Sequence, residues 1–326
     1  MSTTTLKPSR PALLDRTVPF GPVAFGLCRI ALGVYLAVHF LHLLPYAGEL
    51  FGHRGLLPDP GQNLIPLLIP NPLASSLAWM PSAVILLGAL SGIGLAFGRL
   101  RPLFALSGWL VWAWVFGRNN LIINPGIPYV GLLLLVCAIL PAGEAFVPGR
   151  TRNRDWRMPA LVWWMMWLLL AVGYTFSGYC KLASPSWIDG SALLDVMQNP
   201  LARDGLPRDL FLSLPTAVQR LATWGALGLE LAFLPLALIP RTRRFVWAAM
   251  LLMHLGIMTM IHFADLSLGM VLIHLFTLPP TLHFIRRSQR TQTTQPKATH
   301  HVLADPAFRP EGAQKSPHPT PALAPR

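Results

Sequence analysis

Apolar residues dominate eight stretches of the chain, and short segments rich in polar residues, proline or glycine separate them. These stretches cover residues 21–45, 76–97, 101–117, 126–143, 158–181, 216–239, 243–263 and 266–285. A helix rises about 1.5 Å per residue, so stretches of this length suit a bilayer whose hydrocarbon core is roughly 30 Å thick. They lack the alternation of apolar and polar positions that membrane β-strands show. The pattern predicts an all-α fold, a polytopic membrane helical bundle of about eight transmembrane helices.

The remaining segments define the expected organisation of the chain. Residues 1–20 form a basic N-terminal tail, and residues 21–286 form the eight-helix membrane domain. Residues 46–75 are too interrupted by Pro and Gly to span, so we expect them at the membrane interface. The last segment, 287–326, is rich in Thr, Gln, Pro and His without periodicity, and it is expected to be a disordered tail. The first apolar stretch has no cleavage site of the signal-peptide kind, and we expect it to be retained.

Composition and charge agree with a membrane protein. Hydrophobic residues make up 53% of the chain and charged residues 12%, whereas a soluble domain has about 25% charged residues. The net charge of +13 could suggest nucleic acid, but most Lys and Arg fall in alternate connecting segments. By the positive-inside rule this places both termini in the cytoplasm, with anionic lipids of the inner leaflet as partners and no nucleic acid. The expected location is the bacterial inner membrane.

An arginine and a glutamate lie within apolar stretches. Placing a charge at the bilayer centre costs about 2.5–3.5 kcal/mol on insertion scales, so each needs a partner or a purpose. Counted along the helices, Arg29 and Glu230 lie at similar depths from the cytoplasmic side. We therefore predict a structural ion pair between them that ties the first stretch to the sixth. A proton or ion path through the two residues is the alternative.

A second group of polar residues lies at the predicted outer ends of several helices. Its members are His39, His42, Arg118, Asn119, Asn120, Asn124, Lys181 and His262. Their similar depth is consistent with a single outward-facing site. Two plainer interpretations stay open, because a lysine at a helix end can extend to the headgroups and Trp187 can belong to an interfacial aromatic belt.

Two other sets of residues have modest predicted roles. His254, at mid-depth in the seventh stretch, is either a hydrogen-bonded core residue or a member of the site. No metal site is predicted, because His254, His262 and Asp265 do not share one helical face. Three cysteines are too few for a disulfide framework, and by depth Cys180 is too far from Cys28 and Cys137 to pair with either.

Six short segments resemble, in matching order, the vitamin K-dependent γ-carboxylase family and the wider bacterial group called the HTTM (horizontally transferred transmembrane) domain. The segment most similar to the family's lysine motif is SGYCKLASPSWIDG at 177–190. The others are GLCRIALG at 26–33, LFGHRGLLP at 50–58, GRNNLIINPGIPYVGLLLL at 117–135, LGLELAFLPLAL at 227–238 and MHLGIMTMIHF at 253–263. The resemblance covers about residues 20–285.

This resemblance implies a chemistry for Lys181. In the carboxylases the matching lysine is the base that deprotonates vitamin K hydroquinone, and an amine partly withdrawn from water suits that role. The resemblance implies a catalytic group of Lys181, His262, His39, Asn119 and Asn120. It also implies that a quinol such as vitamin K hydroquinone is held by Tyr174, His254 and Trp187.

Two departures from the family limit what the resemblance implies. A histidine that the carboxylases carry after the Asn pair falls near Gly126 here. The lumenal C-terminal domain that captures propeptides has no counterpart in this sequence, so propeptide-directed carboxylation by this chain alone is not expected.

Three functions remain open from the sequence. The first is a quinol-linked, carboxylase-like membrane enzyme that uses Lys181 as base at an outer-facing cavity, with a peptide or protein as candidate substrate. The second is a non-enzymatic membrane partner or maturation factor for an exported peptide. A transporter is disfavoured, because the sequence shows no inverted repeat with paired broken helices.

Overall fold

Helices form the whole of the regular structure in the computed structural model, which describes residues 20–58 and 70–279. No β-strand occurs in these residues, and Ala202 and Ile261 form one isolated bridge. The all-α prediction is therefore confirmed. The predicted tails at 1–20 and 287–326 lie outside the described residues, apart from Phe20.

One helix lies on each of the eight predicted stretches. They are α1 (Pro22–Leu43), α3 (Met80–Phe97), α4 (Arg101–Arg118), α5 (Ile127–Ile139), α6 (Ala160–Lys181), α10 (Thr216–Leu238), α11 (Pro240–Met260) and α12 (Ala264–Phe276). Among the described residues, four helical segments are long and apolar enough to cross a membrane: α1 with its continuation to Phe51, α3, α6 and α10. The helices α5 and α12 are apolar but have only 13 residues each. These lengths and compositions are compatible with an integral membrane protein.

Short helices occupy the connections. Between α1 and α3 lie η1 (Leu44–Tyr46), α2 (Ala47–Phe51) and η3 (Pro72–Ala74), and η4 (Asn120–Ile122) precedes α5. The connection from α6 to α10 folds into α7 (Pro185–Asp189), α8 (Ala192–Gln198) and α9 (Leu206–Ser213). The described parts of 46–75 thus form only short helices. The connection after Lys181 contains three short helices that the sequence pattern did not indicate.

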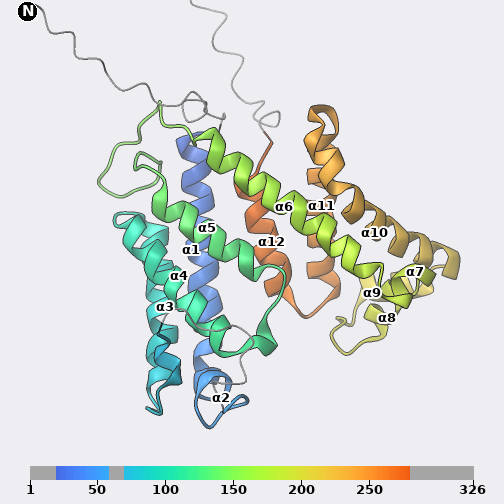
Figure 1. The fold of residues 1–326 in the computed structure, drawn as a ribbon, viewed down its shortest axis with the longest axis horizontal. Coiled ribbons are helices and arrows are strands. Elements are labelled where there is room, and N and C mark those ends of the chain that lie inside the picture. Colours follow the sequence, from blue (N-terminus) through green and yellow to red (C-terminus); the bar gives the residue numbers. More distant parts are fainter. Residues whose placement is uncertain (1–19, 59–69, 280–326) are drawn as a thin grey trace, which may run out of the picture. The chain divides into compact units, whose positions relative to one another are not determined.

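The long helices form two neighbouring groups that α12 connects (Figure 1). In the first group α1 packs on α3, α3 on α4, and α4 on α5; in the second, α6 packs on α10 and α10 on α11. Glycines allow the closest approach between α1 and α3, because a Cβ at Gly33 would lie 2.6 Å from the Gly92 carbonyl oxygen. Close packing of this kind is common between membrane helices.

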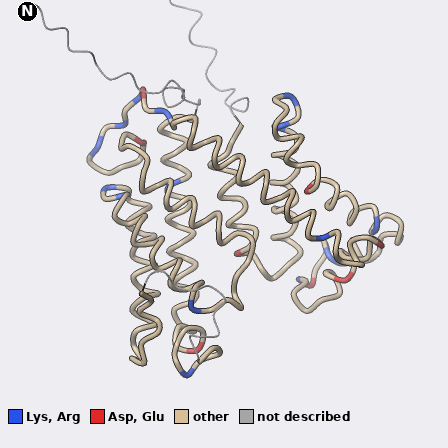
Figure 2. Tube along the Cα trace, viewed as in Figure 1, with Lys and Arg blue, Asp and Glu red and all other residues tan. Residues whose placement is uncertain are grey.

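The helix α6 shows why an apolar surrounding suits the fold. Its inward stripe, which includes Trp163, Trp167 and Tyr174, is buried, whereas Leu168 and Phe176 on the opposite stripe are exposed. Exposed apolar stripes along a long helix are favourable in lipid and unfavourable in water. Lys and Arg gather near helix ends and connections, and long central stretches carry no charge (Figure 2).

Candidate functional site

The predicted ion pair between Arg29 and Glu230 is wrong, because each residue has a nearer partner. Arg29 lies 3.7 Å from a carboxylate oxygen of Glu144, which also pairs with Arg101 at 3.0 Å. Arg29 also donates to the backbone oxygens of Leu95 and Phe146, at 2.6 and 2.9 Å. Depth can be counted only along a helix, and Glu144 lies in the connection between α5 and α6, so its position could not be predicted in this way.

Glu230 pairs with Lys181 instead. The Lys181 Nζ atom donates to both carboxylate oxygens, at 2.6 and 2.5 Å, and to the Ser177 hydroxyl at 3.2 Å. It also lies 4.8 Å from the centre of the Trp187 ring, within range of a cation–π interaction. The amine is therefore held by three side chains from α6, α7 and α10.

Helix geometry explains this pairing. Side chains on a helix lean toward its N-terminus, so Lys181 at the end of α6 extends back along the helix past Ser177, four residues earlier. The helices α6 and α10 approach closely at Gly178, where a Cβ would lie 2.9 Å from the Leu231 nitrogen. Lys181 thus points into the protein, and only 24% of its side chain and 8% of that of Glu230 are exposed. An outward, headgroup-directed conformation is not what the structure shows.

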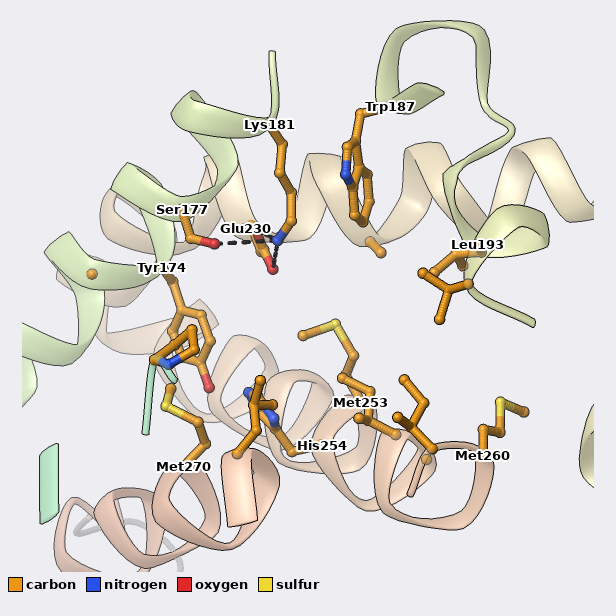
Figure 3. A pocket seen from close by; sticks show the side chains of 18 of the residues that line it. Tyr174, Ser177, Lys181, Trp187, Leu193, Glu230, Met253, His254, Met260 and Met270 are labelled. Atoms are coloured by element: carbon orange, nitrogen blue, oxygen red, sulfur yellow. Dashed lines mark hydrogen bonds and ion pairs between the residues drawn. The ribbon is translucent and has the colours of Figure 1, made fainter. Parts of the chain in front are cut away.

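The pair opens onto a cavity of about 380 Å³ (Figure 3). Helices α6 and α8 to α12 and the short helix α7 all contribute residues to its walls. Apart from the polar groups, the lining is apolar and flexible, with the methionines Met197, Met253, Met260 and Met270. Methionine adapts to irregular apolar partners, and an apolar cavity with a few converging polar groups is the usual form of a small-molecule site.

Two further polar residues, Tyr174 and His254, line this cavity on the side opposite Lys181 (Figure 3). The Tyr174 hydroxyl and the His254 Nε2 atom are buried, and neither has a hydrogen-bond partner among the described residues. The exposed fractions of these residues are 4% and 5%. Their rings lie 5.9 Å apart, and the His254 Nδ1 atom approaches the Ser267 hydroxyl at 3.5 Å. Buried polar atoms without a partner are uncommon and call for an explanation.

A third aromatic residue lies behind these two. The His274 ring is 5.8 Å from Tyr174 and 6.2 Å from His254, and its Nδ1 atom contacts the Met270 carbonyl oxygen at 2.7 Å. It does not line the cavity. His274 therefore supports the positions of the two residues that do.

The structure thus brings part of the predicted site together. Lys181 lines one cavity with Tyr174, His254 and Trp187, the three residues expected to hold a cofactor. The resemblance gave Lys181 its role, but neither it nor the depth argument placed Glu230 beside it. The contact between Lys181 and Ser177 could have been predicted, since the two residues are four apart and face one side of α6.

The other predicted catalytic residues do not line this cavity. His39 contacts the Asp265 carboxylate at 2.9 Å, and Tyr35 and Asn124 donate to the same carboxylate at 2.5 and 3.0 Å. This cluster joins α1, the loop before α5 and α12. The cluster brings together His39 and Asn124, two members of the predicted outer group, around Asp265, which that group did not include.

Asn119, Asn120 and His262 lie in connections. Asn119 is buried, donates to the Leu50 carbonyl oxygen at 2.9 Å and accepts from the Leu121 nitrogen at 3.0 Å. Asn120 begins η4. His262 is exposed, and its backbone nitrogen donates to the Leu201 oxygen at 2.8 Å.

Cysteines and metal ligands add no further site. Cys28 and Cys137 are buried, Cys180 is exposed, and all three are free thiols. The described residues hold no group of three or more His, Cys, Asp or Glu side chains arranged to bind a metal ion. Comparison of the chain with protein-family models, with curated proteins and with solved structures finds no match.

Proposed function

We propose that this chain is a membrane-embedded enzyme of the HTTM and vitamin K-dependent γ-carboxylase type, which removes a proton from a quinol or another lipid-borne hydroxyl compound. The observation that supports this best is the position of the Lys181 amine, held against Glu230 at the wall of an apolar cavity of about 380 Å³. A cavity of this size suits a small apolar molecule.

Lys181 and Glu230 can together take up the proton of a substrate hydroxyl without any change in the total charge of the site. Lys181 passes a proton to Glu230, and the neutral amine then accepts the proton of the substrate hydroxyl. The products are a protonated Glu230, an ammonium at Lys181 and a substrate oxyanion beside that ammonium. The positive charge stabilises the oxyanion where it forms, which is the main electrostatic contribution expected of such a site.

The proposal includes a membrane orientation. The eight helices on the predicted stretches would all span the bilayer, with both termini in the cytoplasm of a bacterium. The cavity would lie toward the outer side. The distribution of basic residues supports this, since Arg99, Arg101 and the basic residues of 150–157 and 241–244 fall in predicted inner segments. The short helices α5 and α12 would cross a part of the bundle where neighbouring helices and connections complete the span.

The test uses 2-methyl-1,4-naphthohydroquinone as substrate under argon, with the purified full chain in lipid nanodiscs. The unmodified protein should produce the ultraviolet spectrum of the hydroquinone anion. Lys181→Ala and Glu230→Gln should abolish it, whereas the control Asp204→Asn, which changes an exposed carboxylate, should not. An anion spectrum that persists in both site variants would remove the proposal.

A non-enzymatic membrane partner is the second candidate, and one surface favours it. On the connection between α6 and α10, Leu201, Leu206 and Leu210 are 56%, 79% and 61% exposed. Exposed leucines on short helices outside the long bundle suit contact with another chain. Recovery of one stoichiometric partner, lost on Leu206→Ser and Leu210→Ser, would favour this function.

A further inference from the structure

A second, more open hollow of about 620 Å³ adjoins the cavity. The two share the wall residues Pro125, Gly173, Ser177, Lys181 and Trp187. Only the open hollow reaches Phe176 and Cys180, and only the cavity reaches Tyr174 and Glu230. Lys181 therefore lies between the cavity and the more open hollow, and lines both.

The surface of α6 shows how the two hollows connect. Phe176 and Cys180, four residues apart, lie on its exposed stripe, and Phe176 is 64% exposed. Gly173, Ser177 and Lys181, also at intervals of four, form a half-buried stripe, and Tyr174 lies on the buried stripe beyond it. On the intermediate stripe the Tyr129 hydroxyl packs against Gly173, where a Cβ would lie 1.8 Å from it. The small Ser177 side chain, between Gly173 and Lys181, lines both hollows and marks the passage from the exposed face to the cavity.

Hydrogen bonds fix the connection that contains α8 and α9 beside the other end of the cavity. The Arg203 nitrogen donates to the Met260 oxygen at 2.8 Å, and its side-chain Nε atom donates to the Ile261 oxygen at 2.8 Å. The Arg208 side chain donates to the Met197 oxygen at 2.7 Å. The two Arg203 bonds hold this connection against the end of α11, and the Arg208 bond ties α9 to α8 within the connection.

The interior of the cavity indicates an occupant. The Tyr174 hydroxyl and the His254 Nε2 atom are more than nine-tenths buried and unpaired among the described residues. A ligand with an oxygen at that end would satisfy them after a small turn of the two side chains toward it. An apolar body would meet the methionines, and a hydroxyl at the other end would reach Lys181.

We propose that the open hollow over Gly173, Ser177, Phe176 and Cys180 is the lateral entrance by which an apolar, hydroxyl-bearing molecule dissolved in the bilayer reaches the cavity. The route leads from the lipid-facing stripe of α6, past Lys181, to Tyr174 and His254. This inference rests on the proposed function only in requiring that the cavity takes such a ligand. It adds the path and the physical phase from which the ligand comes.

The native cysteines allow a direct test in the full chain. Cys180 lines the entrance and is exposed, whereas Cys28 and Cys137 are buried, so N-(1-pyrenyl)maleimide should modify Cys180 alone in nanodiscs. The probe is 4-hydroxybenzophenone, which is apolar, carries an acidic hydroxyl and photocrosslinks readily to methionine. Mass spectrometry then measures its labelling rate at Met253 and Met260, inside the cavity.

A matched control places the same adduct elsewhere on the exposed stripe. In the double variant Cys180→Ser, Val172→Cys, the new thiol lies on α6 at a residue that is 45% exposed and lines neither hollow. The pyrene group on Cys180 should slow cavity labelling by about tenfold, because it obstructs association. The adduct at position 172 should leave the rate nearly unchanged.

Each outcome is informative. Labelling slowed by the adduct on Cys180 and unaffected by the adduct at position 172 supports the entrance. Equal labelling with and without the Cys180 adduct overturns the entrance and leaves the proposed function standing. No cavity labelling in the unmodified protein overturns both, since the cavity would not accept an apolar hydroxyl compound.

Discussion

Two ion-paired groups in this chain differ in what surrounds them. Arg29 and Arg101 share the Glu144 carboxylate and also donate to backbone oxygens of Leu95, Phe146 and Leu140. Lys181 and Glu230 also form a close pair, but they line an apolar cavity. The first group is surrounded by protein on all sides. We therefore expect the filled group to contribute to stability and the pair at the cavity to take part in the proposed reaction.

The largest expected effect is at Glu144. Glu144→Gln leaves the Arg29 and Arg101 side chains, which are 0% and 2% exposed, without a compensating charge. Removing one partner of a buried ion pair costs about 3–5 kcal/mol. Thermal unfolding of the detergent-solubilised protein should show a large loss of stability. An unchanged midpoint would mean that this group does not tie the helices together.

The next effect is on reaction rather than stability. Lys181→Ala should lower the rate of hydroquinone deprotonation by at least about a hundredfold, the usual contribution of a positioned acid–base group. Lys181→Arg should not restore the rate, because a guanidinium does not give up its proton. Stopped-flow absorbance measures the rate, and a matching circular dichroism spectrum confirms the fold. Normal rates in both variants would assign Lys181 a structural role.

A smaller effect is expected at Tyr174. Tyr174→Phe removes a hydroxyl that has no partner among the described residues, so protein stability should be unchanged or slightly higher. Binding of 4-hydroxybenzophenone should weaken about fivefold to tenfold, the value of one hydrogen bond of about 1–1.4 kcal/mol. Calorimetric titration measures this. Benzophenone, which lacks the hydroxyl but keeps the carbonyl oxygen, should lose as much affinity for the variant. If it does not, the ligand lies in the reverse orientation, with its hydroxyl at Tyr174.

The smallest effect serves as a reference for the others. Asp204 and Arg208 form a pair with a separation of 3.1 Å, in which the Asp204 side chain is 97% exposed. Exposed pairs of this kind contribute about 0.3–0.5 kcal/mol. Asp204→Asn should therefore change neither the unfolding midpoint nor the reaction measurably. A large change would show that the connection containing α9 contributes more to the fold than its exposure suggests.

The sequence predicted the helices well because long apolar stretches have few alternatives. It did not predict the lengths of α5 and α12, because Leu140 and Leu278 continue the apolar pattern where each helix has already ended. It also missed α7 to α9, which are too short for a periodic signal. These errors lie at helix ends and in a connection, where tertiary contacts decide the structure.

The sequence predicted Lys181 as a site residue but did not predict its partner Glu230. Lys181 could be singled out because a charge at the end of an apolar stretch is unusual, and the resemblance supplied a role for it. Its partner could not be found from depth, because a lysine side chain extends along the helix and shifts the charge away from its Cα. Glu144 was overlooked because a connecting segment carries no predictable depth.

In the proposed reaction, Glu230 receives a proton through Lys181 when a hydroxyl compound occupies the cavity. Infrared difference spectroscopy of the full chain in nanodiscs, with and without 2-methyl-1,4-naphthohydroquinone, observes that proton directly. We expect a new carboxylic acid C=O band on addition of the hydroquinone. The band should be absent in Glu230→Gln and retained in Asp204→Asn. No such band, or a band that persists in Glu230→Gln, would contradict it.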